Sequence, residues 1–155
     1  MNRVVTGRDE SGHPVIVFHG QPPTVISAGR YVTTELWVSD PATPLAPGAD
    51  AAAREWALEP PPGGACFRIV EIAPGDGGAE QAASADHEEF QGAHQTDTLD
   101  YVTVLRGEVT LIVGDSEVTL RPGDCVVQQP GVPHDWQNRT AEASVMVGVL
   151  LSARG

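Results

Sequence analysis

The sequence predicts an all-β fold, and three observations support this prediction. Short β-branched or alternating segments recur along the chain, and turn signals separate them. Glycine and proline are both frequent, with 17 and 13 occurrences in 155 residues, which favours short strands over long helices. No internal repeat or helical heptad is present. Regular short strands with Gly and Pro turns are typical of a sandwich, a jelly roll or a barrel.

The N-terminal part of the chain contains two kinds of segment. Residues 3–5 and 15–18 are β-branched runs around an acidic, glycine-containing turn, and they predict a β-hairpin. Residues 31–38 alternate as a strand does, and we expect one wetter face, formed by Tyr31, Thr33, Glu35 and Trp37. Residues 39–64 are rich in Pro and Ala, so we expect a connector with at most one or two helical turns over 50–58.

The remainder of the chain predicts the main barrel. Residues 67–72 read as a strand, and residues 74–92 as a long loop that is either a lid or a solvated insertion. Five further strands are expected, with glycine-containing turns between most of them: 100–105, 109–113, 117–120, 125–128 and 144–151. The length predicts one domain over 1–155, with a β arm and connector over 1–64 and the barrel over 65–152.

Charge and cysteine content exclude several functions. The net charge of −12 repels phosphate backbones and anionic lipid surfaces, so we expect neither nucleic acid nor a membrane as a partner. No stretch approaches the ~18 apolar residues of a membrane span, and the first residues do not resemble a signal peptide. Cys66 and Cys125 lie in apolar runs and are expected to be buried free thiols. These features predict a reduced, cytoplasmic compartment.

Two short segments carry metal-competent or proton-transferring side chains. His94 and Thr96 share one face of a strand because they are two residues apart, and Asp100 can rejoin that face after a short break. His134 follows a Pro- and Gly-containing turn, and Trp136 continues its alternation. In a rolled sheet the two segments can meet at the barrel centre, where they would form one polar site.

The first segment resembles the first motif of the cupin superfamily of small jelly-roll barrels. That motif has two histidines separated by one residue, then a glutamate, then a glycine. His94 takes the first position, Thr96 stands where the second histidine belongs, Asp100 stands at the glutamate position, and Gly107 matches the glycine.

The second segment is similar to the second cupin motif, and it is the stronger of the two matches. Gly123, Gly131, His134 and Asn138 stand at the expected spacings, and Gln129 occupies the proline position. The resemblance covers about residues 66–151. Within the superfamily, the chain is similar to a subgroup of short microbial members that lack a single agreed activity.

The resemblance implies a double-stranded β-helix (a jelly-roll barrel) with an N-terminal β arm, and a homodimer whose N-terminal strands cross between subunits. It also implies that His94, Asp100 and His134 hold a divalent transition metal, namely Fe, Mn, Ni or Zn. The same three residues are the candidate catalytic residues. The expected substrate pocket adds further side chains: Thr96, Trp136, Gln129 and Val102. Asn138 is expected to fix a turn rather than contact a ligand.

Three functions are compatible with these residues. The first is a metal-dependent enzyme acting on a small neutral or aromatic molecule such as a secondary metabolite, with oxygenase, isomerase, decarboxylase and lyase chemistry all open. The second is a metal-free barrel that binds a small molecule without catalysis, which Thr96 at the second histidine position favours. The third is a metal-free acid–base isomerase or epimerase in which Asp100 orients a histidine.

Overall fold

The computed structural model describes residues 1–43, 45–46, 48–75 and 92–154. The described residues form strands and turns without a helix, which confirms the all-β prediction. The strands are β1 Arg3–Arg8, β2 Pro14–Gly20, β3 Thr24–Ala28, β4 Tyr31–Ser39, β5 Ala65–Ile72, β6 Thr98–Arg106, β7 Val109–Val113, β8 Ser116–Leu120, β9 Cys125–Gln128, β10 Asp135–Gln137 and β11 Ser144–Ser152.

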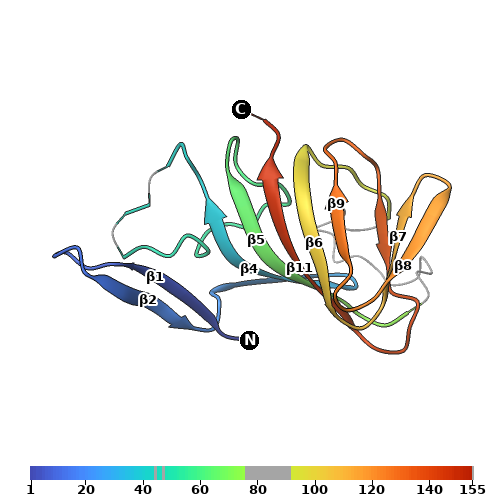
Figure 1. Ribbon diagram of the computed structural model, residues 1–155, viewed down its shortest axis with the longest axis horizontal. Helices are drawn as coiled ribbons and strands as arrows, with labels where there is room; N and C mark the ends of the chain where they lie inside the picture. The colour runs from blue at the N-terminus through green and yellow to red at the C-terminus, as the bar shows by residue number, and fades with distance from the viewer. Residues whose placement is uncertain (44, 47, 76–91, 155) are drawn as a thin grey trace.

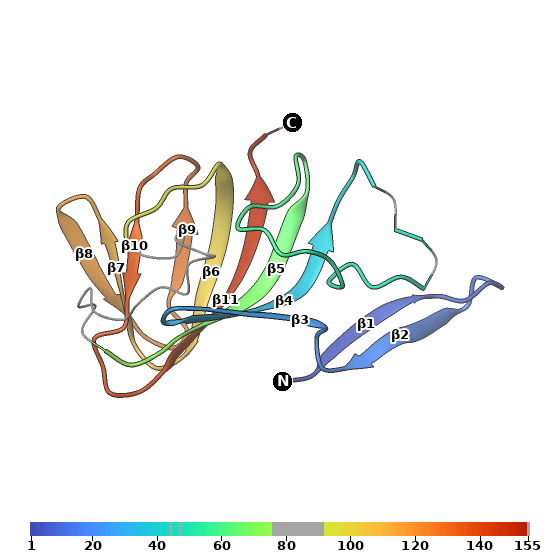
Figure 2. The same ribbon diagram turned by 180° about the vertical axis from the view of Figure 1, so that it is seen from behind.

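The barrel consists of two antiparallel sheets. The larger has the order β3-β4-β5-β11-β6-β9, and the smaller has the order β10-β7-β8. The smaller sheet lies beyond β9, while the β1–β2 hairpin projects at the other end, beyond β4 (Figures 1 and 2). A backbone bridge between His94 and His134, outside the named strands, connects the segment before β6 to the segment before β10.

The structure extends the barrel further toward the N-terminus than the sequence indicates. The predicted hairpin is present as β1 and β2, but β3 and β4 are part of the main sheet, since β4 pairs with β5. The boundary placed between residues 64 and 65 therefore does not separate the arm from the barrel. Residues 50–58 form turns and bends rather than helical turns. The predicted loop over 74–92 lies largely outside the described residues.

The predicted wetter face of β4 is the face that lines the barrel. Thr33 and Glu35 are each only 2% exposed. A bulge between Glu35 and Trp37 then inserts Leu36, so Trp37 does not stay on this face, and Val38 faces the interior next to Cys66. The bulge thus corrects the expectation that Trp37 shares the face of Glu35.

A ladder of cross-strand neighbours forms the centre of the barrel floor. Glu35 on β4 lies opposite Arg68 on β5, Arg68 lies opposite Gly148 on β11, and Gly148 lies opposite Val102 on β6. Since side chains alternate between the two faces of a sheet, these four positions share the interior face. The site is therefore built on a floor that carries two charges and a gap where Gly148 has no side chain.

Apolar side chains close the barrel around this floor. The main buried cluster joins β5, β6, β11, β7, β8 and β10, and consists of Ile72, Val104, Val109, Leu111, Leu120, Trp136 and Met146. Burial of these side chains is the main stabilising contribution, at roughly 25 cal/mol per Å² of apolar surface. Trp136 belongs to both this core and the wall of the cavity described below.

The two cysteines differ from each other. Cys66 is buried as predicted, and burial raises its pKa to about 11, which keeps the thiol protonated and unreactive. Cys125 is exposed, so its predicted burial is wrong. It lies on β9, an edge strand of the larger sheet, and its side chain is on the outward face of that strand. Tyr101 is 48% exposed and faces outward, as its place next to Asp100 predicts.

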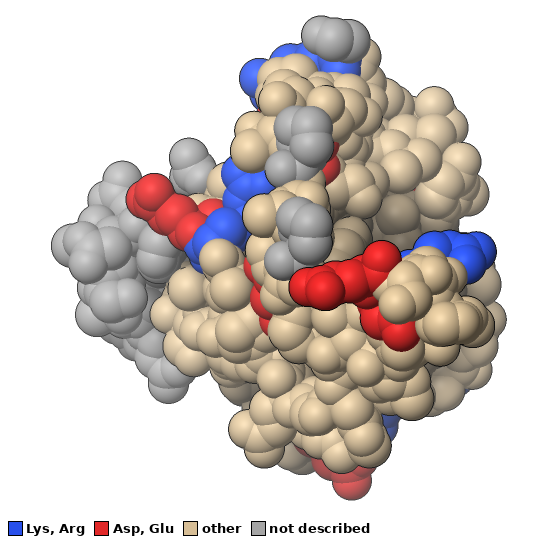
Figure 3. Space-filling view, turned by 90° about the vertical axis from the view of Figure 1, so that its left-hand side faces the viewer, with Lys and Arg blue, Asp and Glu red and all other residues tan. Residues whose placement is uncertain are grey.

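The surface on the side of the hairpin is mostly uncharged, and its acidic and basic side chains are few and scattered (Figure 3). The hairpin leaves apolar side chains exposed, among them Val4 at 55% and Ile16 at 63%.

The expected homodimer and the expected cytoplasmic location stay predictions. Among the described residues, none lies in a helix of the length and apolarity needed to span a membrane.

Asn138 fixes the turn before β11, as expected. Its side chain is fully buried, and its Nδ2 donates to the carbonyl oxygens of Ile72 at 3.0 Å and Glu142 at 2.7 Å. Its Oδ1 accepts from the backbone N–H of Thr140 at 3.0 Å and from the Thr140 hydroxyl at 2.8 Å. All the hydrogen-bonding groups of this amide therefore have partners.

Replacing Asn138 by Ala is expected to lower the free energy of unfolding by about 3 kcal/mol, because it leaves buried donors and acceptors unpaired. Urea denaturation measures the change, with Asn2→Ala at an exposed position as the control. A loss below about 1 kcal/mol would show that water replaces the amide and that the side chain is not a structural anchor.

Candidate functional site

A cavity opens in the barrel between the two sheets, and most of the predicted site residues line it. Its volume is about 660 Å³, measured out to its opening to solvent. The lining combines apolar side chains with several polar and charged ones, and such a mixture can hold and orient a small molecule. The lining residues are Tyr31, Thr33, Leu58, Arg68, Val70, His94, Thr96, Asp100, Val102, His134, Trp136, Met146, Gly148 and Leu150.

The two predicted histidines lie side by side on one wall of this cavity. Their backbones form a bridge in both directions, with N–H to carbonyl distances of 3.0 and 2.9 Å. Their ring centroids are 4.5 Å apart, and the ring planes are tilted by 56°. The His134 ring is in turn nearly perpendicular to the Trp136 ring, with an interplanar angle of 84° and centroids 6.3 Å apart. The prediction that the two motif segments meet inside the barrel is thus correct for these residues.

Backbone carbonyls determine which nitrogen of each ring carries the hydrogen. His134 Nδ1 lies 2.9 Å from the carbonyl oxygen of Val132, and His94 Nδ1 lies 3.4 Å from that of Gly92. A carbonyl oxygen only accepts, so in each contact Nδ1 is the donor. Nε2 of each neutral ring then keeps its lone pair. No hydrogen bond from a described residue engages either Nε2 atom, and this pair of nitrogens is the main chemical resource of the site.

The electrostatic surroundings keep His94 in its neutral form. Burial is the main cause that lowers its pKa below the ordinary 6.5, and the neighbouring His134 lowers it further. At neutral pH the His94 imidazole is therefore unprotonated and available as a base or a hydrogen-bond acceptor.

Thr96 and Thr98 form a pair of hydroxyl groups on the strand face that Asp100 shares. Their Oγ1 atoms are 2.7 Å apart. Asp100 is 7% exposed, and its Oδ1 is buried without a hydrogen-bond partner among the described residues. Burial raises the pKa of Asp100 above 3.8, more than Thr98 and His134 lower it. Its ionised form is therefore disfavoured.

The substitution Asp100→Asn is expected to stabilise the protein at pH 7. The raised pKa means that the folded state holds this proton more tightly than the unfolded state, so stability is lost as pH rises above 3.8. Asn removes that cost because it carries no ionisable group. Thermal unfolding of both proteins between pH 4 and pH 8 measures the effect.

We expect the two melting temperatures to converge near pH 4, where the wild-type carboxyl group is protonated on folding. Asp124→Asn, an exposed carboxylate in the turn before β9, is the control. A variant less stable than wild type at pH 7 would show that a partner such as a bound cation stabilises the Asp100 carboxylate.

The sequence did not identify Glu35 and Arg68 as site residues. Arg68 lines the cavity, donates to Glu35 Oε2 at 2.8 Å, and also donates to the carbonyl oxygens of Leu58 at 2.9 Å and Ala57 at 3.2 Å. Both charged side chains are 3% exposed. The sequence shows one acidic and one basic residue on two strands that follow each other along the chain. That these two residues form a pair becomes evident only once the register between the strands is known.

The remaining predicted pocket residues divide into two groups. Thr96, Trp136 and Val102 line the cavity as expected. Gln129 does not: its side chain is exposed, and the preceding Gln128 is the buried one. This follows from β9, which ends at Gln128 with that side chain facing inward opposite Asp100.

The residues present do not fit the expected three-ligand metal centre. Among the described residues, no three His, Cys, Asp or Glu side chains come close enough together to hold a metal ion. The barrel brings His94 and His134 into contact, whereas Asp100 does not join them in such a group, and Thr96 has no strong donor for a transition metal. Ligand distances of about 2.0–2.2 Å leave little tolerance for such departures.

The fold and cavity define a class of protein: a small jelly-roll barrel with a mostly apolar interior site and a polar histidine wall. A family model described as a cupin domain matches residues 68–150. The chain therefore belongs to the cupin family, as the two motifs indicate.

Curated relatives and solved structures support this assignment. The chain is 32% identical to "Phomopsin biosynthesis cluster protein C'" of Diaporthe leptostromiformis, and to protein D of the same cluster, over 99% of this chain and 79% of each relative.

The fold is similar to that of the polyketide cyclase RemF from Streptomyces resistomycificus (TM-score 0.51, 15% identity, 82% of this chain and 68% of that one). It is also similar to the cupin domain of an XRE family transcriptional regulator from Enterobacter cloacae (TM-score 0.50, 15% identity, 81% and 99%). At these identities the likeness concerns the fold alone.

Proposed function

We propose that the barrel binds a small, uncharged, flat organic molecule and that His94 and His134 transfer a proton on it without a metal ion. The observation that carries this proposal is the pair of imidazoles in contact, each with Nδ1 held by a backbone carbonyl and Nε2 left for a ligand. The disagreement between the residues present and a three-ligand metal centre supports the metal-free form.

The charges of the site favour an uncharged ligand. Arg68 is the cation on the cavity floor, and Glu35 neutralises it at 2.8 Å. Burial disfavours the ionised form of Asp100, and His94 is neutral at pH 7. An anionic ligand would also meet the overall charge of −12. Trp136 and the apolar wall suit an aromatic ring.

Two adjacent imidazoles can move a proton between positions of one molecule. Nε2 of one ring takes a proton from a C–H or O–H bond of the substrate and becomes an imidazolium. That imidazolium, or its neighbour after proton exchange, returns a proton to another atom of the same molecule. The sum is an isomerisation in which atoms and electrons balance without a co-reactant.

The curated relatives support a secondary-metabolite substrate. They are named as proteins of a phomopsin biosynthesis cluster, and their alignment spans nearly the whole of this chain. We therefore propose that this protein acts on an intermediate of a biosynthetic route, as an isomerase, epimerase or cyclase that shifts a proton.

The probe 5-nitrobenzisoxazole tests this proposal, because it is neutral, flat and aromatic and rearranges when a base removes its C3 proton. The N–O bond then breaks and a coloured cyanophenolate forms. We expect turnover above that of free imidazole. Since burial lowers the pKa of His94 below 6.5, the rate should reach half its plateau below pH 6.5.

The variants His94→Gln and His134→Gln are expected to lower the rate by about 100-fold. His19→Gln, at an exposed position on β2, is the matched control and should leave the rate unchanged. A chelator should have no effect. Equal rates in wild type and both site variants would contradict the proposal.

A metal-dependent site is the second candidate, favoured by the same carbonyl contacts, because metal-bound histidines also hold their second nitrogen in a hydrogen bond. His94 and His134 would then be the protein ligands of a divalent metal, which would act as a Lewis acid. Elemental analysis of untagged protein separates the two candidates. A near-stoichiometric transition metal that His134→Ala removes would support the second candidate and overturn the first.

A further inference from the structure

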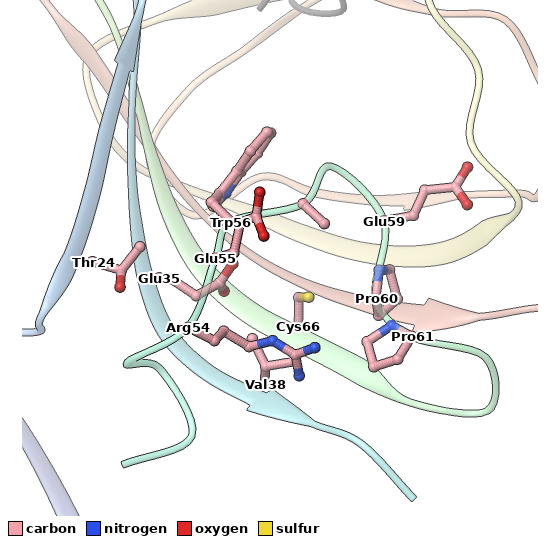
Figure 4. A pocket seen from close by; sticks show the side chains of 11 residues that line it. Thr24, Glu35, Val38, Arg54, Glu55, Trp56, Glu59, Pro60, Pro61 and Cys66 are labelled. Atoms are coloured by element: carbon pink, nitrogen blue, oxygen red, sulfur yellow. The ribbon is translucent and has the colours of Figure 1, made fainter. Parts of the chain in front are cut away.

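A second cavity lies next to the barrel site, on the other side of the Glu35–Arg68 ion pair. It lies between β4, β5 and the segment 54–61 that runs across them (Figure 4). Its volume is about 470 Å³, measured out to its opening to solvent. Glu35 lines this cavity and Arg68 lines the barrel cavity, so the ion pair forms part of the wall between them.

The second cavity contains a buried acceptor without a donor. Glu35 is 2% exposed and accepts from Arg68 at Oε2, and its Oε1 is buried without a hydrogen-bond partner in the described part of the chain. A buried acceptor without a partner is costly, and it marks a place where a donor group would be stabilised. In this structure the terminal nitrogens of Arg68 donate to Glu35 Oε2, Leu58 and Ala57, and among the described residues neither Arg68 Nε nor Glu35 Oε1 has a hydrogen-bond partner.

The other charges around this cavity add to the negative potential. Glu55 is exposed at its edge, and no ion pair in the described part of the chain engages it. Glu59 also lines the cavity and pairs with Arg154. The cation in the lining is Arg54, which Asp40 neutralises at 3.5 Å. With Glu35 paired to Arg68, Glu59 to Arg154 and Arg54 to Asp40, the carboxylate of Glu55 is the one in this lining that has no ion pair in the described part of the chain.

Part of the cavity wall is apolar and formed by flat rings. Figure 4 shows Glu35 and Glu55 beneath the Trp56 ring, with Pro60 and Pro61 across the cavity from them. Val38 and Cys66 complete the apolar surface. Burial keeps the Cys66 thiol protonated, so it contributes packing rather than charge.

We propose that this second cavity binds a small organic ammonium ion, with the ammonium group donating to Glu35 Oε1 and the hydrocarbon part packed between Trp56 and the two prolines. A primary amine supplies donors that a buried carboxylate lacks. The apolar walls favour an alkyl or aryl substituent over a hydrated inorganic cation. Among the described residues, no group of three side chains suits a metal ion here.

Benzylammonium chloride is the probe, and benzyl alcohol is its neutral control of similar shape. Two-dimensional NMR on the labelled wild-type protein follows the titration. We expect shifts at Trp56, Ala57 and Cys66 with benzylammonium, and at least about 10-fold weaker binding of benzyl alcohol, since the charge-assisted bond is then missing. Equal binding of the two probes, or shifts spread over the outer carboxylates, would overturn the proposal.

Variants identify the residue responsible. Glu35→Gln should weaken benzylammonium binding at least about 10-fold, and Glu117→Gln, an exposed carboxylate on β8, is the matched control. Because Glu35→Gln leaves Arg68 without its anion, the double variant Glu35→Gln/Arg68→Met tests the same loss in a protein without the unpaired charge. Unchanged binding in the double variant would overturn the proposal. The 5-nitrobenzisoxazole assay does not depend on this cavity, so the two proposals can fail separately.

Discussion

Replacing Arg68 by Met is expected to lower the free energy of unfolding by about 3–5 kcal/mol, the usual cost of leaving a buried charge unpaired. Arg68 and Glu35 are both 3% exposed and lie opposite each other on β5 and β4. Without the guanidinium, the Glu35 carboxylate remains in the barrel wall without its ion-pair partner, and the nearby Arg54 pairs with Asp40 instead. Urea denaturation at pH 7 measures the loss.

The pH dependence of this variant provides an independent check. Burial already raises the pKa of Glu35 above 4.5, against the opposing effect of Arg68. Removing Arg68 raises this pKa further, so the folded state binds the proton more tightly than the unfolded state. The stability deficit of the variant should therefore be largest above pH 7 and should shrink as pH falls toward 4.5.

Two further variants separate the pair from the individual residues. The double variant Glu35→Leu/Arg68→Met should recover most of the lost stability, because it removes both charges from the interior. Arg106→Met, which breaks the exposed pair with Glu71 at 3.4 Å, should cost less than about 1 kcal/mol. If Arg68→Met cost no more than Arg106→Met, the buried ion pair would not be the anchor that the structure indicates.

Replacing Gly148 by Phe is expected to abolish turnover of the barrel probe, with a loss of at least about 100-fold, or about 2.8 kcal/mol of binding. Gly148 lies in the middle of β11 between Arg68 and Val102 on the cavity floor. Its φ is not in the left-handed region, and an added Cβ would lie 3.5 Å from Leu150 Cδ1 and 3.7 Å from Val102 Cγ2. The strand therefore accepts a side chain, which then fills the cavity.

Alanine and an outer-face variant are the controls for this prediction. Gly148→Ala should raise the free energy of unfolding by up to about 1 kcal/mol, since Gly in a strand is entropically unfavourable, and should keep turnover within a few-fold of wild type. Val127→Phe on the exposed face of β9 should change neither property. Full activity in a folded Gly148→Phe protein would show that the probe does not react in this cavity.

Local sequence patterns predict most of the strands of the fold. The turn-flanked runs at 3–5 and 15–18 become the β1–β2 hairpin, and the five C-terminal segments become β6 to β9 and β11 with small changes of boundary. These predictions are accurate because turn chemistry and alternation are local properties. The same local signals, with the cupin motifs, place His94 and His134 together.

What the sequence by itself determined was therefore the position along the chain of every strand except β3 and β10, the histidine pair and the turn at Asn138. Only the tertiary structure decided that β4 faces the barrel with Glu35, that Arg68 pairs with it, and that no three ligand side chains gather among the described residues. The reason is physical: alternation gives a strand two faces but does not say which one is inside. Cross-strand register, a bulge and interatomic distances decide which charges and ligands meet.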